Sequence, residues 1–161
     1  MSKADGMAGR LARVLALATP ALLLGGAYIS QYVFGLAPCE MCWWQRYGHF
    51  AALAIALAAW LRPGAGWLTG LAGLAIAAAG PIGLFHAGVE YGWWQGLTAC
   101  SAPATAGGGD PLEAIMNAPL VRCDVAPWSL LGVSLAGWNF LFSTAAALAI
   151  GFLLLRNQRA S

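Results

Sequence analysis

The sequence predicts an all-α membrane protein built as a bundle of four transmembrane helices. The first observation is composition, because 60% of the 161 residues are hydrophobic, 9% are charged, and the mean hydropathy is +0.70. Soluble domains carry about 25% charged residues, so this chain has too few charges to cover a surface that faces water. The second observation is a set of long uncharged runs, and the third is the uneven distribution of the basic residues.

The uncharged runs define the expected helices. They extend over residues 14–39, 47–61, 63–89 and 125–155. A helix needs roughly 20 mostly apolar residues to cross a bilayer. Three runs are long enough alone, and the second becomes long enough if its helix starts near Trp43 and includes Arg46. We expect one membrane domain, 1–161, with helices at 14–34, 43–61, 67–88 and 133–155. The loops expected between them on the outer side comprise residues 35–42 and 89–132.

The basic residues fall mainly on one side of this four-span arrangement. Six of the eight share that side: Lys3, Arg10, Arg13, Arg62, Arg156 and Arg159. Only Arg46 and Arg122 fall on the other side, with five of the acidic residues. Because basic residues mark the cytoplasmic side, we expect both termini in the cytoplasm. Topology accounts for these cations, and no basic cluster indicates binding to nucleic acid.

All four cysteines fall on the outer side. Cys39 and Cys42 form a C-x-x-C motif before the second helix, and Cys100 and Cys123 lie in the loop 89–132. Disulfides persist outside the cytoplasm, and four cysteines permit three pairings. Three interpretations are open at this point: two structural disulfides, a zinc site made of all four thiolates, or thiol–disulfide exchange.

The surroundings of Cys42 favour redox chemistry. A C-x-x-C spacing lowers the pKa of a thiol, especially at the start of a helix. Pro38 breaks the chain just before the motif, so the helix is expected to begin near Cys42, where its dipole favours a thiolate. Arg46 follows four residues later on the same helical face. Its charge suits the stabilisation of a negative sulfur or a bound acceptor, and the alternative is an anchor at the lipid headgroups.

The loop 89–132 contains a helix start of its own. Asp110 is placed as N-cap, Pro111 as the first helical residue and Glu113 as a reciprocal cap. We expect this short helix to lie on the membrane surface between Cys100 and Cys123. Two cysteines on a pliant loop suit the transfer of a disulfide to another protein.

Net disulfide formation needs an external oxidant. The sequence has neither a G-x-G-x-x-G nucleotide motif nor a C-x-x-C-H haem attachment. A quinone dissolved in the bilayer takes two electrons, which matches a dithiol. Gln31 and His86 are expected near the depth of Cys42, where they would bond to quinone carbonyls, although Gln31 also suits a contact between helices. A haem held by His49 and His86 is a rival that leaves the cysteines unexplained.

Three motifs together resemble one known family. They are GLAPCEMCWWQR, with Gln31 eight residues before its first cysteine, FHAGVEYGWWQGLTAC, and CDVAPWSLLGVSLAGWNF. In this order they resemble the bacterial disulfide-bond-formation protein B family, DsbB. The resemblance implies a protein-dithiol:quinone oxidoreductase of the bacterial inner membrane, with its cysteines on the periplasmic side. It would reoxidise a periplasmic thioredoxin-like carrier similar to DsbA and reduce ubiquinone or menaquinone.

The resemblance also implies a role for each site residue. Cys100 resembles the loop cysteine that the reduced carrier attacks to form a mixed disulfide. Cys123 resembles its resolving partner, which pairs transiently with Cys39. Cys42 matches the thiolate that contacts the quinone, and Arg46 matches the arginine that supports it.

The remaining implications concern the quinone site and the fold. Gln31 and His86 match positions near the quinone, and the family fold is a four-helix membrane bundle with a short horizontal helix in the second outer loop. The vitamin K epoxide reductase type also couples cysteine pairs to quinones, but its quinone-facing C-x-x-C lies late in the chain. The alternative to redox turnover is a membrane protein with structural disulfides or a four-cysteine zinc site.

Overall fold

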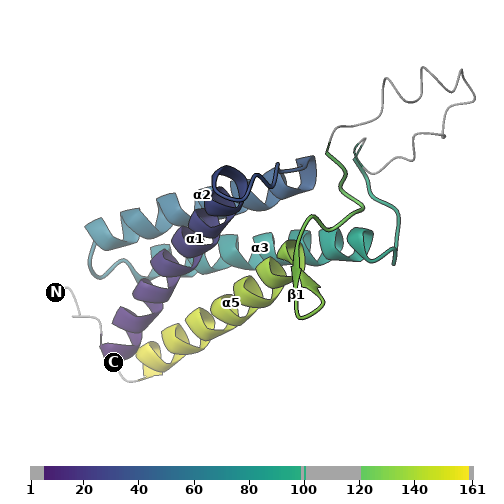
Figure 1. Ribbon diagram of the computed structural model, residues 1–161. Coiled ribbons are helices and arrows are strands. Elements are labelled where there is room, and N and C mark those ends of the chain that lie inside the picture. Colours follow the sequence, from purple (N-terminus) through teal and green to yellow (C-terminus); the bar gives the residue numbers. More distant parts are fainter. Residues whose placement is uncertain (1–5, 99, 101–120, 160–161) are drawn as a thin grey trace, which may run out of the picture.

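Four long helices dominate the computed structural model, which describes residues 6–98, 100 and 121–159. They are α1 (Met7–Tyr32), α2 (Glu40–Leu61), α3 (Gly66–Glu90) and α5 (Leu135–Arg159) (Figure 1). A small antiparallel hairpin precedes α5 and consists of β1 (Ser129–Leu130) and β2 (Val133–Ser134). The helices confirm the predicted all-α class, and the hairpin was not predicted. The short helix expected after Asp110 lies outside the described residues.

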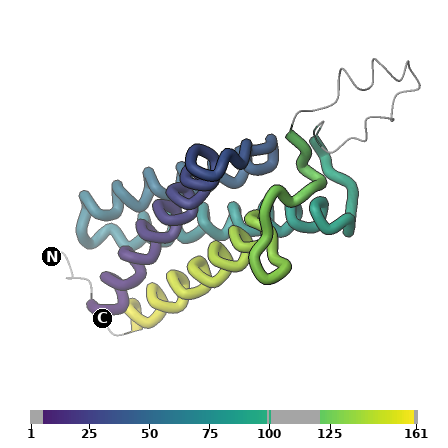
Figure 2. Tube along the Cα trace, in the orientation of Figure 1, coloured from purple at the N-terminus to yellow at the C-terminus, as the bar shows by residue number. Residues whose placement is uncertain are grey.

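The helices pack as a bundle in which the start of α1 and the end of α5 lie at the same end. Helix α3 packs against α2 and α5, and α1 packs against the same two helices. The start of α1 and the end of α5 lie near each other in the trace (Figure 2). In agreement with this, Gly9 near the start of α1 lies against the side chain of Asn157 near the end of α5. The hairpin and the start of α2 lie toward the opposite end of the bundle (Figure 1).

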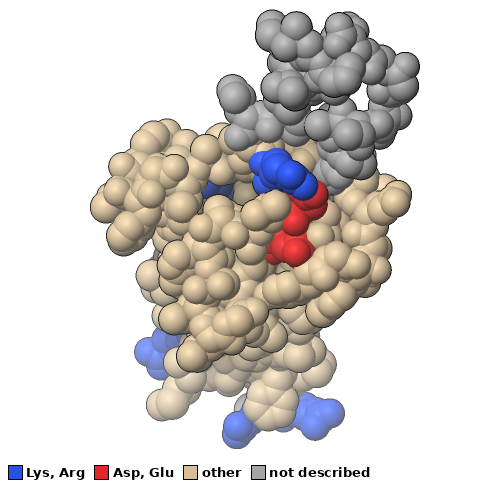
Figure 3. Space-filling view, turned by 45° about the vertical axis from the view of Figure 1, so that its right-hand side comes forward, with Lys and Arg blue, Asp and Glu red and all other residues tan. Residues whose placement is uncertain are grey.

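The outer surface of the bundle suits a lipid environment. Helices α1, α3 and α5 are each long and apolar enough to cross a membrane. Large apolar side chains on these helices point outward and are more than half exposed, namely Leu22, Leu74, Leu148 and Phe152. Helix α2 has 22 residues and carries Glu40 and Arg46 in its first two turns. Basic side chains lie at the lower end of the face shown in Figure 3, whereas acidic side chains lie toward the upper end, with further basic side chains beside them.

Small residues bring the helices close together. The central cluster contains five buried alanines with two isoleucines: Ala12, Ala16, Ala52, Ala56, Ala72, Ile76 and Ile150. Small side chains allow helix backbones to approach in a membrane, where contacts between helices depend on close packing. At Gly83 of α3 a Cβ atom would lie 2.8 Å from the backbone oxygen of Ala136. The same close approach brings the amide of Asn139 in α5 beside α3.

Two helix ends differ from the expected boundaries and affect the site. Helix α2 begins at Glu40 rather than at residue 43, and Cys39 is its N-cap. The sulfur of Cys39 accepts a hydrogen bond from the backbone N–H of Cys42 at 3.3 Å, which places Cys42 in the first turn. Helix α3 continues to Glu90, so this acid belongs to a helix and not to the expected loop.

Candidate active site

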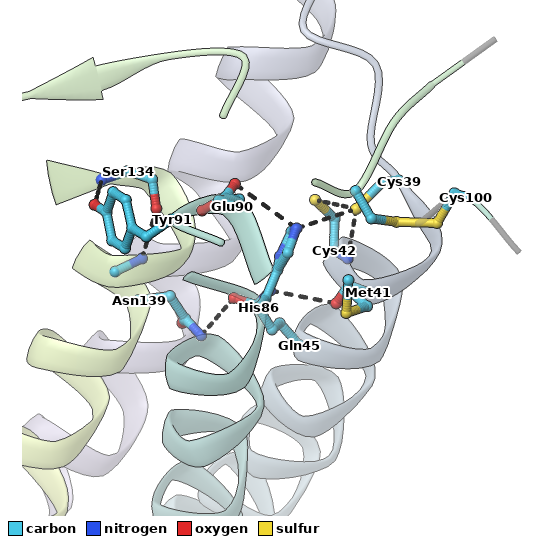
Figure 4. Close-up of polar contacts among 12 residues, drawn as sticks. Cys39, Met41, Cys42, Gln45, His86, Glu90, Tyr91, Cys100, Ser134 and Asn139 are labelled. Carbon is cyan, nitrogen blue, oxygen red and sulfur yellow. Dashed lines mark hydrogen bonds and ion pairs between the residues drawn. A yellow bond between two sulfur atoms is a disulfide. The ribbon is translucent and has the colours of Figure 1, made fainter. Parts of the chain in front are cut away.

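The fold brings all four cysteines into one cluster. Cys39, Cys123 and Met41 are buried together, and Cys42 and Cys100 pack against them. Cys100 and Cys123 form a disulfide, whereas Cys39 and Cys42 are free thiols (Figure 4). The two pairs, which are far apart in the sequence, therefore pack against each other.

The two free thiols are not equivalent. Cys39 is only 5% exposed, and its thiol donates a hydrogen bond to the sulfur of Cys42 across 3.2 Å. This hydrogen bond, followed by burial, raises the pKa of Cys39 well above its ordinary value. Cys39 therefore keeps its proton and directs it at Cys42, which is the arrangement that favours Cys42 as the thiolate of the pair.

Arg46 is held inside the bundle, one turn below Cys42. Its side chain is buried and donates hydrogen bonds to Gln31 Oε1 at 2.6 Å and to the backbone oxygen of Ala27 at 3.1 Å. The guanidinium also lies 4.9 Å from the ring centres of Tyr28 and Trp43, within the range of cation–π attraction. A buried and oriented guanidinium does not fit an anchor that reaches toward headgroups. Gln31, in turn, reaches the site as the partner of Arg46.

A cavity of about 400 Å³ lies among α1, α2, α3 and α5. Most of its lining is apolar, and the titratable or charged side chains that line it are Cys42, Arg46, His49, His86 and Glu90. Sites for small organic ligands have volumes of roughly 300–1,000 Å³ and combine apolar walls with a few placed polar groups. This lining therefore fits a flat polar ring that carries a hydrophobic tail, which is the chemistry of a quinone.

Hydrogen bonds fix the orientation of the His86 ring. Its Nδ1 lies 2.9 Å from Gln45 Nε2, and that amide nitrogen also donates to the backbone oxygen of Met41 at 3.3 Å. A carbonyl oxygen only accepts, so the amide nitrogen must point at it and Nδ1 must accept. The hydrogen of neutral His86 is therefore on Nε2, which lies 3.5 Å from Cys39 Sγ (Figure 4).

The same network continues into α5. Asn139 donates from Nδ2 to Gln45 Oε1 at 2.8 Å and to the backbone oxygen of Ala79 at 3.4 Å. His49 lies 2.7 Å from Asn139 through its Nε2 and completes the chain. This network accounts for His49 and His86 without a haem. Sequence reasoning missed Gln45 and Asn139, although polar side chains inside apolar helices are the signal that marks them.

The cysteines do not form a common set of four thiolates. The sulfurs of Cys100 and Cys123 are bonded to each other, so a four-cysteine zinc site does not describe this state. Cys39, Cys42 and His86 do bring potential ligand atoms within 4.8 Å of one another. The network around Gln45, however, places a hydrogen on His86 Nε2, which removes the lone pair that a metal would need.

In this chain a free C-x-x-C pair lies beside a largely apolar cavity, and a disulfide packs against that pair. For a helical membrane protein, this arrangement indicates the class of membrane thiol–disulfide oxidoreductases. The sequence matches the family described as disulfide bond formation protein DsbB over residues 9–153, and the chain belongs to this family. The resemblance seen in the three sequence motifs is thereby confirmed. No solved structure shows a significant match to this chain.

Similar proteins cover nearly the whole chain. Disulfide bond formation protein B of Marinobacter nauticus is 32% identical over 143 residues, which are 83% of this chain and 84% of that protein. The protein of the same name from Verminephrobacter eiseniae is 34% identical and covers 93% and 88% of the two chains. That of Chromohalobacter salexigens is 34% identical and covers 92% of each. The chain is thus a multi-pass membrane protein-dithiol:quinone oxidoreductase, as the sequence motifs implied.

Proposed function

We propose that this chain reoxidises a periplasmic DsbA-like carrier through Cys100 and Cys123, and reduces a quinone at Cys42. The observation that carries this proposal is that Cys42 and Arg46 line the same largely apolar cavity, while Cys39 packs against the second cysteine pair. In this proposal the oxidant enters the cavity from the membrane and reacts with the sulfur of Cys42. A bound quinone would supply a two-electron acceptor, and both ubiquinone and menaquinone have the required chemistry.

The first half of the reaction exchanges disulfides. A thiolate of the reduced carrier attacks Cys100, which is more exposed than the fully buried Cys123, and releases Cys123 as a thiolate. The second carrier thiol then displaces Cys100, so the carrier leaves as a disulfide. Cys123 next attacks Cys39 of the Cys39–Cys42 disulfide, and Cys100 resolves the bond between them. Each exchange conserves the number of disulfides. Afterwards Cys39 and Cys42 are free thiols and Cys100 is again bonded to Cys123, as in the structure.

The second half removes two electrons from the Cys39–Cys42 pair. Cys39 holds a proton and Cys42 accepts its hydrogen bond. The electron pair leaves through Cys42, Cys39 releases its proton, and the two sulfurs become bonded. Arg46 supplies a fixed positive charge at the cavity wall for the negative charge that develops there. Gln31 and the backbone of Ala27 keep the guanidinium in place.

We further propose that all four helices cross the inner membrane with both termini in the cytoplasm. The unequal distribution of the basic side chains supports this orientation and agrees with the charge pattern visible in Figure 3. The cysteines then face the periplasm, where disulfides persist. The short horizontal helix after Asp110 remains part of this proposal.

Steady-state turnover tests the proposal through Arg46. Purified protein, a reduced carrier and a soluble quinone are mixed, and quinone absorbance is followed while each substrate is varied. We expect Arg46→Ala to raise the KM for quinone about 10- to 100-fold, because hydrogen bonds to charged groups contribute about 1.5–3 kcal/mol. The KM for the carrier should change little. The KM of Arg46→Lys for quinone should lie between those of the wild type and Arg46→Ala, because lysine keeps the charge but loses the planar fork of the guanidinium.

The matched control is Arg62→Ala, which removes an exposed arginine just after the far end of α2 and should leave both constants unchanged. If the wild-type protein consumes no quinone with reduced carrier, the proposed function is wrong. If Arg46→Ala affects the carrier as strongly as the quinone, Arg46 has a general structural role.

A further inference from the structure

His49 is a buried histidine on the cavity wall to which the steps described above give no task. It is 2% exposed and lines the cavity together with Cys42 and Arg46. Spacings of four and three residues along α2 put these three residues on one face of the helix. From that face Arg46 reaches α1 through Gln31, whereas His49 reaches α5 through Asn139. Two polar side chains of α2 thus meet different neighbouring helices around the same cavity.

Hydrogen bonds to α5 locate the single hydrogen of the neutral His49 ring. Asn139 Nδ2 donates to the backbone oxygen of Ala79, which only accepts, so Asn139 Oδ1 is the atom that faces His49. His49 Nε2 lies 2.7 Å from that oxygen and must donate to it. Ser143 Oγ donates to the same oxygen at 3.3 Å. The other ring nitrogen, Nδ1, therefore keeps a free lone pair and is a hydrogen-bond acceptor.

This acceptor has no partner among the residues that the structure describes, although Nδ1 is buried. Buried polar atoms are nearly always hydrogen-bonded, so an exception requires an explanation. A second proton on the ring would create a buried charge, which needs pairing, and in the described part of the chain no carboxylate forms an ion pair with His49. No cluster of potential metal ligands in that part includes His49 either. What Nδ1 lacks is a hydrogen-bond donor from a ligand in the cavity.

We propose that His49 Nδ1 accepts a hydrogen bond from a hydroxyl group of the quinol, so that the cavity binds the quinol more tightly than the quinone. This inference rests on the proposed function. A quinone carries carbonyl oxygens, which only accept, whereas the hydroxyl groups of a quinol also donate. A carbonyl oxygen placed at Nδ1 would bring two acceptors together. A hydroxyl group at the same position satisfies the nitrogen.

Arg46 and His49 then have different tasks in the cavity. The guanidinium of Arg46 carries only donors and can bind an oxygen of either form, whereas Nδ1 of His49 distinguishes the two forms. Tighter binding of the reduced form raises the reduction potential of the bound quinone, which favours oxidation of the dithiol. A tenfold difference between the two dissociation constants corresponds to about 30 mV for a two-electron couple.

Equilibrium binding of a short-chain ubiquinone and of its quinol tests the proposal. The full-length protein carries Cys42→Ser, which forms no disulfide with Cys39 and so exchanges no electrons with either form, and isothermal titration calorimetry gives both dissociation constants. We expect this protein to prefer the quinol. Adding His49→Phe should weaken quinol binding about 2- to 10-fold, the range for one lost hydrogen bond, without weakening quinone binding. His49→Asn places an amide oxygen near the position of Nδ1 and should retain the preference.

The matched control is Ser143→Ala, which removes a hydroxyl group from the contacts of His49 Nε2 and Asn139 and leaves Nδ1 untouched. It should not change the ratio of the two dissociation constants. Equal affinities for quinone and quinol before His49 is changed would overturn the proposal, and so would an equal loss of both in His49→Phe. Binding of neither form would instead contradict the proposed function.

Nitrogen NMR of labelled histidine provides a readout without turnover. The chain has only two histidines, so the signals that disappear in His49→Phe belong to His49. We expect the ligand-free protein to show the hydrogen of His49 on Nε2, and the Nδ1 signal to shift when the quinol is added. A hydrogen on Nδ1, or a doubly protonated ring, would remove the acceptor and overturn the proposal.

Discussion

Replacement of Cys42 by serine is expected to abolish quinone reduction while the protein stays folded. The serine oxygen is smaller than the sulfur and takes nearly the same position, but it forms no disulfide and carries no electron pair to an acceptor. The helix start should survive, because the Cys39 N-cap accepts from the backbone of residue 42 and not from its side chain. We expect turnover to fall to the rate measured without protein.

The control for this variant is the first round of exchange with the carrier. The Cys100–Cys123 disulfide is intact in the structure and does not depend on Cys42, so reduced carrier should still open it once in Cys42→Ser. Quinone absorbance reports turnover, and the oxidation state of the carrier reports that single exchange. Continued consumption of quinone by Cys42→Ser with reduced carrier would show that another residue passes on the electrons.

Replacement of Cys100 by serine is expected to have an equally large effect on the other half of the reaction. It removes the disulfide that receives electrons from the carrier, so carrier-driven turnover should be lost completely. Cys39 and Cys42 would remain beside the cavity. Quinone reduction driven by a small dithiol such as dithiothreitol should therefore continue through that pair.

The comparison of the two reductants is the internal control for Cys100→Ser. Loss of both activities would indicate damage to the bundle, and circular dichroism with thermal unfolding would detect it. Unchanged turnover with the carrier would mean that the carrier reacts directly with Cys39 or Cys42, which would contradict the order of exchange proposed above. Together, the Cys42 and Cys100 variants separate the two halves of the reaction.

The helices were predictable because lipid constrains the sequence strongly. A spanning segment must satisfy its backbone internally and carry few charges, so the gaps between charged residues locate the helices. The same rule misplaced Glu90, because counting charges treats every acid as the end of a span. In the structure α3 holds this acid in its last turn, buried beside His86. The hairpin before α5 was missed because two-residue strands leave no periodic pattern.

The site was predictable where it depends on one helix. Cys42 and Arg46 are four residues apart, so any helix through them puts both on one face, and the structure places both at the cavity. Contacts between helices were harder to predict from the sequence. No pattern in the chain indicates that Gln31 bonds to Arg46, or that Gln45 joins His86 to Asn139, because these pairs depend on how the helices rotate and pack.

The central claim is that the Cys39–Cys42 pair passes its electrons directly to a quinone. A single turnover tests it most directly, with protein prepared as in the structure, reduced at Cys39 and Cys42 and oxidised at Cys100 and Cys123. One equivalent of a soluble quinone is added without carrier, and alkylation followed by mass spectrometry identifies the remaining thiols. We predict one quinol formed for each protein and a new disulfide between Cys39 and Cys42. Unreduced quinone with both thiols still free to be alkylated would contradict the account.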